Sequence, residues 1–176
     1  MVVIGVWQAW PADRDESLPS VAEQQQQLSG APSPLATLHA QASELLEGDL
    51  RERLKTLRGH PVVINMWASW CGPCRAELPV LGRVALDTGK EVAFVGLNAD
   101  DKNGRLAAQL LSDYPQSYPS YRDEDSEVAR DLGFLSNFPS TLMLDRRGRT
   151  AFVHQGPYDD EETLRADIRR YLKVDP

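Results

Sequence analysis

The chain has 176 residues, enough for one domain with its own core and a short extension. Hydrophobic residues make up 41% of it and the formal net charge is −7, with the basic residues scattered along the chain. Scattered basic residues in an acidic chain argue against a nucleic-acid partner, and no apolar run is long enough to span a bilayer.

The first part of the chain, residues 1–30, is predicted to be a tail and linker. Residues 1–10, MVVIGVWQAW, are apolar, but they have about half the length of a membrane span and lack the basic start and cleavage site of a signal peptide. Two interpretations stay open: the remnant of a membrane anchor that begins upstream, or an N-terminus that is either flexible or docked on the surface. Residues 11–30 are polar and include a glutamine run, which is typical of a linker.

Residues 31–58 are predicted to form a helical extension. Ser33 can cap a first helix, in which leucines recur at helical spacing until Gly48. Asp49 can cap a second, shorter helix that Gly59 closes. Both helices carry apolar stripes, so they must pack on another surface.

Residues 59–176 are predicted to fold as an α/β domain with a central mixed β-sheet flanked by helices. Short β-branched runs indicate buried strands, and their alternation with helices implies parallel pairing, while a late strand pair implies a hairpin. The elements are expected, in chain order, as a strand at 61–67, a helix at 72–86, a strand at 91–98, a helix at 104–113, a proline- and tyrosine-rich connection at 114–125, a helix ending near 132, strands at 140–145 and 150–155, and a helix at 159–172.

The chain has two cysteines, Cys71 and Cys74, separated by two residues. Such a pair can supply half of a zinc site, cycle between dithiol and disulfide, or stay buried and unreactive. A structural zinc ion needs about four ligands, and the histidines offer no second pair at suitable spacing. These histidines are His39, His60 and His154. No metal site is therefore expected, and redox chemistry is the favoured interpretation.

The position of the pair between a strand and a helix favours redox chemistry. At a helix start, unpaired backbone N–H groups and the helix dipole can stabilise the thiolate of Cys71, lowering the thiol pKa from ~8.5 to between ~3.5 and ~7.5. Gly72 and Pro73 suit the tight entry into the helix. Cys74, one turn along, is expected to face inward and to resolve the mixed disulfide that Cys71 forms with a substrate.

The motif WCGPC after a buried strand, together with Phe138-Pro139-Ser140-Thr141, resembles the active site of the thioredoxin fold. Within that superfamily the chain is similar to the TlpA/ResA-like thiol-disulfide oxidoreductases. Asn65 stands where ordinary thioredoxins carry a buried aspartate, and Glu77 follows the second cysteine by three residues. The resemblance covers roughly residues 57–172. One departure is the helical extension, which replaces the β-hairpin usual in these proteins.

The resemblance implies roles for the residues around the cysteines. Pro139 is expected to be cis, and the loop of Phe138, Pro139 and Ser140 to bind the substrate backbone. Trp70 is expected to flank the exposed sulfur, and Asn65 to support the site. For Glu77 two interpretations stay open: it moves a proton to or from the second cysteine, or it is a solvated glutamate at the start of a helix.

The sequence thus predicts a thiol-disulfide oxidoreductase that reduces protein disulfides through a Cys71–Cys74 cycle, without an organic cofactor. The resemblance further implies an extracytoplasmic protein that is tethered to a membrane upstream of this sequence, takes electrons from a membrane-bound thiol donor and serves cytochrome c maturation. Two alternatives stay open: a thiol peroxidase, and a non-catalytic thioredoxin-like binding module.

Overall fold

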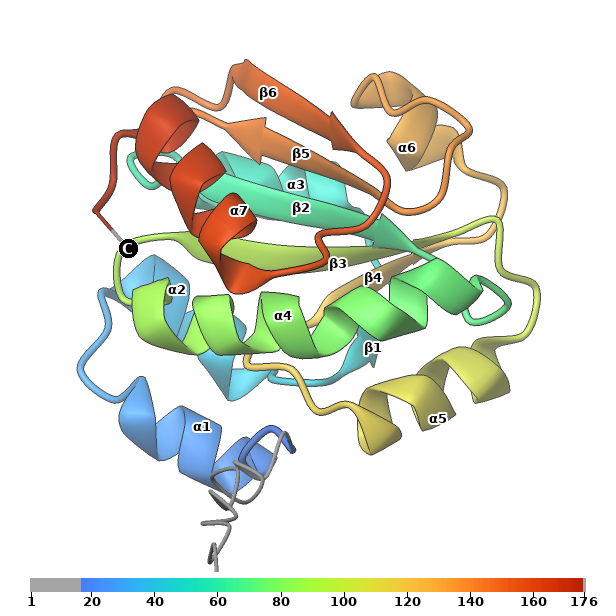
Figure 1. Ribbon diagram of the computed structural model, residues 1–176, viewed down its shortest axis with the longest axis horizontal. Coiled ribbons are helices and arrows are strands. Elements are labelled where there is room, and N and C mark those ends of the chain that lie inside the picture. Colours follow the sequence, from blue (N-terminus) through green and yellow to red (C-terminus); the bar gives the residue numbers. More distant parts are fainter. Residues whose placement is uncertain (1–16, 176) are drawn as a thin grey trace, which may run out of the picture.

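A six-stranded mixed sheet organises residues 17–175, the part of the chain that the structure, a computed structural model, describes. In chain order its elements are α1 (Val21–Gln27), α2 (Ser33–Ala40), β1 (Leu45–Leu46), α3 (Leu50–Thr56), β2 (Val62–Trp67), α4 (Gly72–Thr88), β3 (Ala93–Ala99), α5 (Gly104–Asp113), β4 (Ser120–Asp123), α6 (Glu127–Asp131), β5 (Ser140–Leu144), β6 (Thr150–Gln155) and α7 (Glu161–Asp167), which runs on as a π-helical turn over Ile168–Leu172. Figure 1 shows the helices packed around this sheet.

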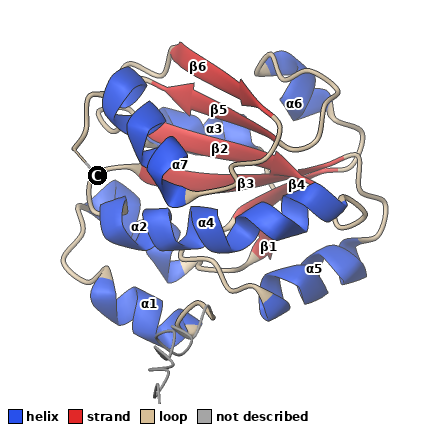
Figure 2. Cartoon of the chain, in the orientation of Figure 1, coloured by secondary structure: helices blue, strands red, loops and turns tan. Residues whose placement is uncertain are grey.

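The strand order is β1-β4-β3-β2-β5-β6. The first four strands in this order pair in parallel, and β5 and β6 add antiparallel strands at the other edge (Figure 2). Every residue of β2 and β3 is buried, because helices cover both faces of the sheet at its centre. The predicted fold class, a mixed sheet between helices with a late hairpin, is confirmed.

Two helical layers enclose the sheet. Helices α4 and α7 cover one face, where their leucines, valines and Ile168 pack on Val63, Phe94 and Met143. Helices α2, α3 and α6 cover the other face, where they pack on Ile64 and Val95. Strand β2 lies inside the sheet, between the two helical layers, so the loop that follows it is held on a rigid base.

The N-terminal region differs from the prediction at residues 21–28. This stretch, expected as a linker, contains helix α1, which begins with a capping box between Ser20 and Glu23. Gln24 is fully buried, and its amide donates to the carbonyl oxygens of Pro19 and Pro115 at 2.7 and 2.9 Å. The linker prediction was wrong here because a glutamine side chain, that of Gln24, helps to attach α1 to the rest of the domain. A sequence pattern of apolar residues does not reveal such a polar contact.

The first helix of the extension is shorter than predicted. Helix α2 begins at Ser33, so Pro32 and not the predicted Ser33 is at the N-cap position, where no side chain makes a capping hydrogen bond. The helix ends at Ala40, and Ser43, at φ +61°, turns the chain away. The following residues, Leu45–Leu46, form β1 and pair in parallel with β4. Strand β4 itself lies in the stretch that was expected to be a connection. These two short strands were missed because neither has the length or the alternation that identifies a strand. The second helix, with Asp49 as its cap, is confirmed.

The extension is continuous with the core of the domain. Leu35, Leu38, Leu50 and Leu57 are fully buried in one cluster with β2 and β3. The boundaries predicted at residues 30 and 58 stay predictions. Residues 1–10, interpreted as an anchor remnant or a docked end, lie outside the described part. Within residues 17–175 no helix is both long and apolar enough to cross a membrane.

Replacing Leu38 by alanine is expected to lower the free energy of unfolding by about 2–5 kcal/mol, because it leaves a cavity between α2 and the sheet. The measurement is chemical denaturation followed by circular dichroism. Leu106→Ala is the matched control, since Leu106 is 54% exposed and its truncation should change stability by less than about 0.5 kcal/mol. Equal, small effects of both variants would contradict a shared core.

Candidate active site

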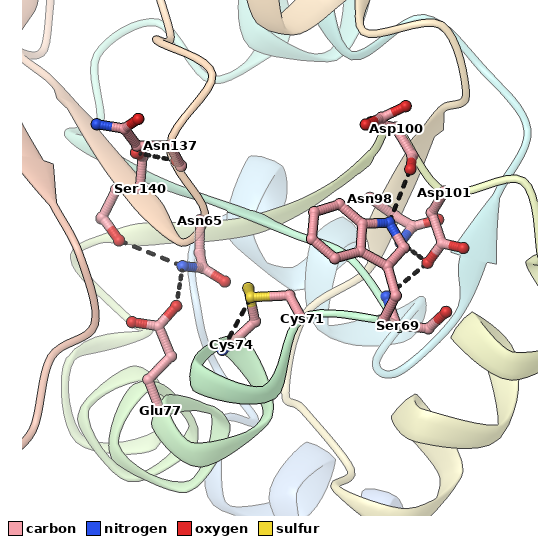
Figure 3. The surroundings of a disulfide bond; sticks show 12 residues. Asn65, Ser69, Cys71, Cys74, Glu77, Asn98, Asp100, Asp101, Asn137 and Ser140 are labelled. Carbon is pink, nitrogen blue, oxygen red and sulfur yellow. Dashed lines mark hydrogen bonds between the residues drawn. A yellow bond between two sulfur atoms is a disulfide. The ribbon is translucent and has the colours of Figure 1, made fainter.

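The two cysteines lie at the N-terminus of α4, directly after β2, and are joined by a disulfide bond (Figure 3). Cys71 is the N-cap residue, and its sulfur accepts a hydrogen bond from the backbone N–H of Cys74 at 3.2 Å. Gly72 and Pro73, which form the start of the helix, are exposed, whereas Cys71 is 4% exposed and Cys74 is fully buried. A thiolate formed at Cys71 would therefore lie at the positive end of a helix 17 residues long.

The loop before β5 faces this disulfide. The Phe138–Pro139 peptide bond is cis, as predicted. The ring of Phe138, half-buried, lies against the indole of Trp70 with the ring centroids 5.0 Å apart. Ser140 is fully buried and its hydroxyl donates to the carbonyl of Asn137 at 2.7 Å. Among the residues predicted to bind substrate, Phe138 is thus the one whose side chain reaches the surface.

Glu77, one turn beyond Cys74, is 1% exposed, so the interpretation as a solvated glutamate was wrong. Its carboxylate accepts hydrogen bonds from the amide nitrogen of Asn65 at 2.7 Å and from the backbone N–H of Tyr158 at 3.0 Å. Burial raises the pKa of Glu77 to about 7, although both hydrogen bonds favour the carboxylate. A carboxyl group with this pKa can give or take a proton near neutral pH.

Trp70 is held in place although it is 57% exposed. Its indole N–H donates to the carbonyl of Asp100 at 2.8 Å. The preceding amide, that of Ser69, donates to the carboxylate of Asp101 at 2.6 Å, and Asn98 donates to the same oxygen at 2.9 Å (Figure 3). Burial alone raises the pKa of Asp101, but the hydrogen bonds from Asn98 and Ser69 outweigh it and keep the pKa below its usual value. The loop before Cys71 is thereby tied to the end of β3.

The acidic pair Asp100-Asp101 and Tyr158 were not among the predicted site residues. The sequence carries a signal for the pair, because the two aspartates come at the end of a buried strand, and the carboxyl ends of parallel strands meet at one edge of the sheet. Tyr158 carries no such signal: it contributes a backbone N–H, which any residue other than proline supplies.

A groove of about 300 Å³ adjoins the site on the side of Phe138. Its lining combines apolar side chains with charged ones from the end of β3 and from α6; it includes Met66, Asp100, Asp125, Arg130, Phe134 and Leu135. Leu135 is 62% exposed. Within residues 17–175 no group of three His, Cys, Asp or Glu side chains could hold a metal ion.

A Cys-X-X-Cys disulfide at a helix start, facing a cis-proline loop on a mixed sheet, defines the class of thioredoxin-like thiol-disulfide oxidoreductases. Comparison with known proteins supports this class. The chain belongs to the Redoxin family, whose model matches residues 29–168.

Two curated relatives bear names that fit the class. The chain is 33% identical over 143 residues to the thiol:disulfide interchange protein DsbE of Pseudomonas fluorescens biotype C, covering 79% of this chain and 73% of that protein. It is 29% identical over 107 residues to the thiol-disulfide oxidoreductase ResA of Oceanobacillus iheyensis, covering 59% of this chain and 54% of that protein. The predicted membership of the TlpA/ResA-like oxidoreductases is confirmed.

Solved structures give the same result. A putative thiol:disulfide interchange protein DsbE from Chlorobium tepidum superposes with a TM-score of 0.60 at 29% identity, covering 67% of this chain and 84% of that chain. A secreted thiol-disulfide isomerase from Corynebacterium glutamicum has a TM-score of 0.57 at 25% identity, covering 68% of this chain and 73% of that chain.

Proposed function

We propose that this chain reduces protein disulfides through the Cys71–Cys74 pair. In the reduced protein, the Cys71 thiolate attacks a substrate disulfide, forms a mixed disulfide and releases one substrate thiolate. Cys74 loses its proton and attacks Cys71, which releases the second substrate thiolate and leaves the pair oxidised. The observation that carries this proposal is the placement of the pair: both cysteines are buried, so the sulfur of Cys71 is not exposed as expected, but Cys71 is the N-cap residue among the exposed Trp70, Gly72 and Pro73, and Cys74 lies inside α4.

The other site residues support this cycle in distinct ways. Glu77 takes the proton of Cys74 when the mixed disulfide is resolved, because its carboxyl group lies one turn away and titrates near neutral pH. Trp70 and Phe138 form the contact surface for the substrate chain, and the cis Pro139 loop presents backbone groups to it. Gly72 and Pro73 leave the approach to Cys71 open, since both are exposed.

The cellular setting is part of the same proposal. The protein acts outside the cytoplasm, tethered to a membrane by a segment upstream of this sequence, and receives electrons from a membrane-bound thiol donor. Apocytochrome c is the proposed substrate in cytochrome c maturation. The relative from Corynebacterium glutamicum, which is described as secreted, supports the extracytoplasmic part of this setting, and the resemblance to the TlpA/ResA-like oxidoreductases supports the rest.

The test is the reduction of insulin disulfides with dithiothreitol as donor. Wild type is expected to accelerate the reaction, and Cys71→Ser to abolish the acceleration while keeping the fold. Acceleration that survives in Cys71→Ser would contradict the proposal. A binding module would give no acceleration even in wild type, and a peroxidase would consume hydrogen peroxide faster than it reduces insulin.

A further inference from the structure

Asn65, at the centre of β2, has a buried oxygen atom without a partner. The residue is 2% exposed, and within the described part of the chain its amide oxygen accepts no hydrogen bond. Its amide nitrogen, by contrast, donates to Glu77 at 2.7 Å and to the hydroxyl of Thr141 at 3.3 Å. A buried acceptor without a donor is unfavourable, so an oxygen left in this state needs an explanation.

The two donated hydrogen bonds fix the direction of the oxygen. Glu77 offers an acceptor to Asn65, so the amide nitrogen must face it, and the oxygen must face the opposite way. In Figure 3 the nitrogen of Asn65 points to Glu77, and its oxygen lies on the side of the disulfide between Cys71 and Cys74. A disulfide has no hydrogen to donate, which explains why the oxygen is unpaired in the oxidised protein.

We propose that Asn65 is a positioning residue for the reduced state: its oxygen accepts a hydrogen bond from the thiol of Cys74. A dithiol donor breaks the Cys71–Cys74 bond and becomes a disulfide itself. Of its two protons, one ends on the sulfur of Cys74 and one passes to solvent, while Cys71 remains a thiolate. The new S–H group supplies the donor that the oxidised protein lacks. This inference rests on the proposed dithiol cycle.

The consequence is a bias in the redox equilibrium. The unpaired oxygen destabilises the oxidised protein, and the hydrogen bond removes that penalty from the reduced protein. The native asparagine therefore makes the pair easier to reduce. It also holds the proton of Cys74 next to Glu77, which shares the same amide, until the mixed disulfide forms.

The test is the equilibrium of the pair with dithiothreitol at about pH 9, compared between wild type and Asn65→Leu. At this pH, above the pKa of about 7 of Glu77, the carboxylate is ionised and accepts the amide hydrogen bond of Asn65 that directs its oxygen toward the disulfide. Asn65→Leu should lower the equilibrium constant for reduction about tenfold, which is about 30 mV for a two-electron couple. Gln24→Met is the matched control, since Gln24 is also fully buried with an unpaired amide oxygen, but lies in α1. It should lower stability equally in both redox forms and leave the equilibrium unchanged.

A second measurement does not depend on the folding of the Asn65 variant. In Cys71→Ser the thiol of Cys74 is the sole S–H group of the chain. If this group donates a hydrogen bond to Asn65, its infrared stretching frequency should be lower than in the same protein unfolded in denaturant. A band at the unfolded position would overturn the inference, as would an unchanged equilibrium constant in Asn65→Leu. Neither readout needs a protein substrate, so a wild type that cycles with dithiothreitol but does not reduce insulin would refute the proposed function and not this inference.

Discussion

Replacing Cys74 by serine is expected to stop the cycle at the mixed disulfide. Cys71 can still attack a substrate disulfide, but the second attack has lost its nucleophile. Well-oriented intramolecular groups reach effective concentrations of ~10⁵ M or more, which millimolar external thiol does not replace, so turnover should fall by more than about 10³-fold. The trapped adduct is measured by non-reducing electrophoresis and mass spectrometry after incubation with reduced enzyme and insulin.

The control for this experiment is Cys71→Ser, which keeps one thiol, that of Cys74 inside α4. We expect little adduct from this variant, because Cys74 is fully buried and the substrate cannot reach its sulfur. Equal adduct yields from the two variants would contradict the assignment of Cys71 as the attacking residue.

Replacing Glu77 by glutamine is expected to change how stability depends on pH. Folding raises the pKa of this carboxyl group from 4.5 to about 7, chiefly through burial. Below pH 4.5 the group is protonated in both the folded and the unfolded chain, and it contributes nothing. Between pH 4.5 and 7 only the unfolded chain loses the proton, so wild-type stability falls as pH rises, by about 3 kcal/mol in total. Above pH 7 the contribution stays constant.

Glutamine does not titrate, so Glu77→Gln removes this pH dependence. The free energy of unfolding of the variant minus that of wild type should increase by about 3 kcal/mol between pH 4 and pH 8. Any constant effect of the altered hydrogen bonds cancels from this change. Urea denaturation of the oxidised proteins at both pH values measures it. A difference that is the same at both pH values would contradict the raised pKa.

The same substitution should slow the resolution of the mixed disulfide. In wild type the rate should increase as pH rises through about 7, where Glu77 becomes able to accept the proton of Cys74. A positioned general base contributes ~10²-fold or more, so Glu77→Gln should resolve about 10²-fold more slowly near neutral pH. Stopped-flow fluorescence of a preformed adduct measures this step. An unchanged rate would leave Glu77 with a structural role.

Local patterns in the sequence predicted the parts of the fold that depend on local physics. The cap at Asp49, the helix start after Cys71 and the continuous apolar runs of β2 and β3 lie where the sequence predicts them. Strands β1, of two residues, and β4, of four, were missed, because strands this short depend on their pairing partners. Helix α1 was missed, although Ser20 and Glu23 have the spacing of a capping box.

In the candidate site, too, some features follow from the local sequence and others from contacts between distant residues. The cysteine motif could be predicted because it carries its chemistry within a few consecutive residues, and the cis bond before Pro139 because the resemblance to the thioredoxin fold implies it. The burial of Glu77 could not, because it depends on Tyr158, which lies 81 positions later and closes over it. The anchor of Ser69 on Asp101 likewise joins two loops 32 residues apart. Which polar residues are buried and paired is decided by such distant contacts, not by local sequence.

The central claim, that Cys71 and Cys74 form a reducing dithiol pair, is tested most directly by their reduction potential. The protein would be equilibrated in thiol buffers of graded potential and followed by fluorescence, since Trp67 is buried in one cluster with both cysteines and Trp70 flanks Cys71. We predict a single two-electron transition that lies nearer to ~−270 mV, the value of thioredoxin, than to ~−120 mV, that of a strong oxidant. A transition at the oxidising end would contradict the reducing direction, and the absence of any two-electron transition would contradict the redox function itself.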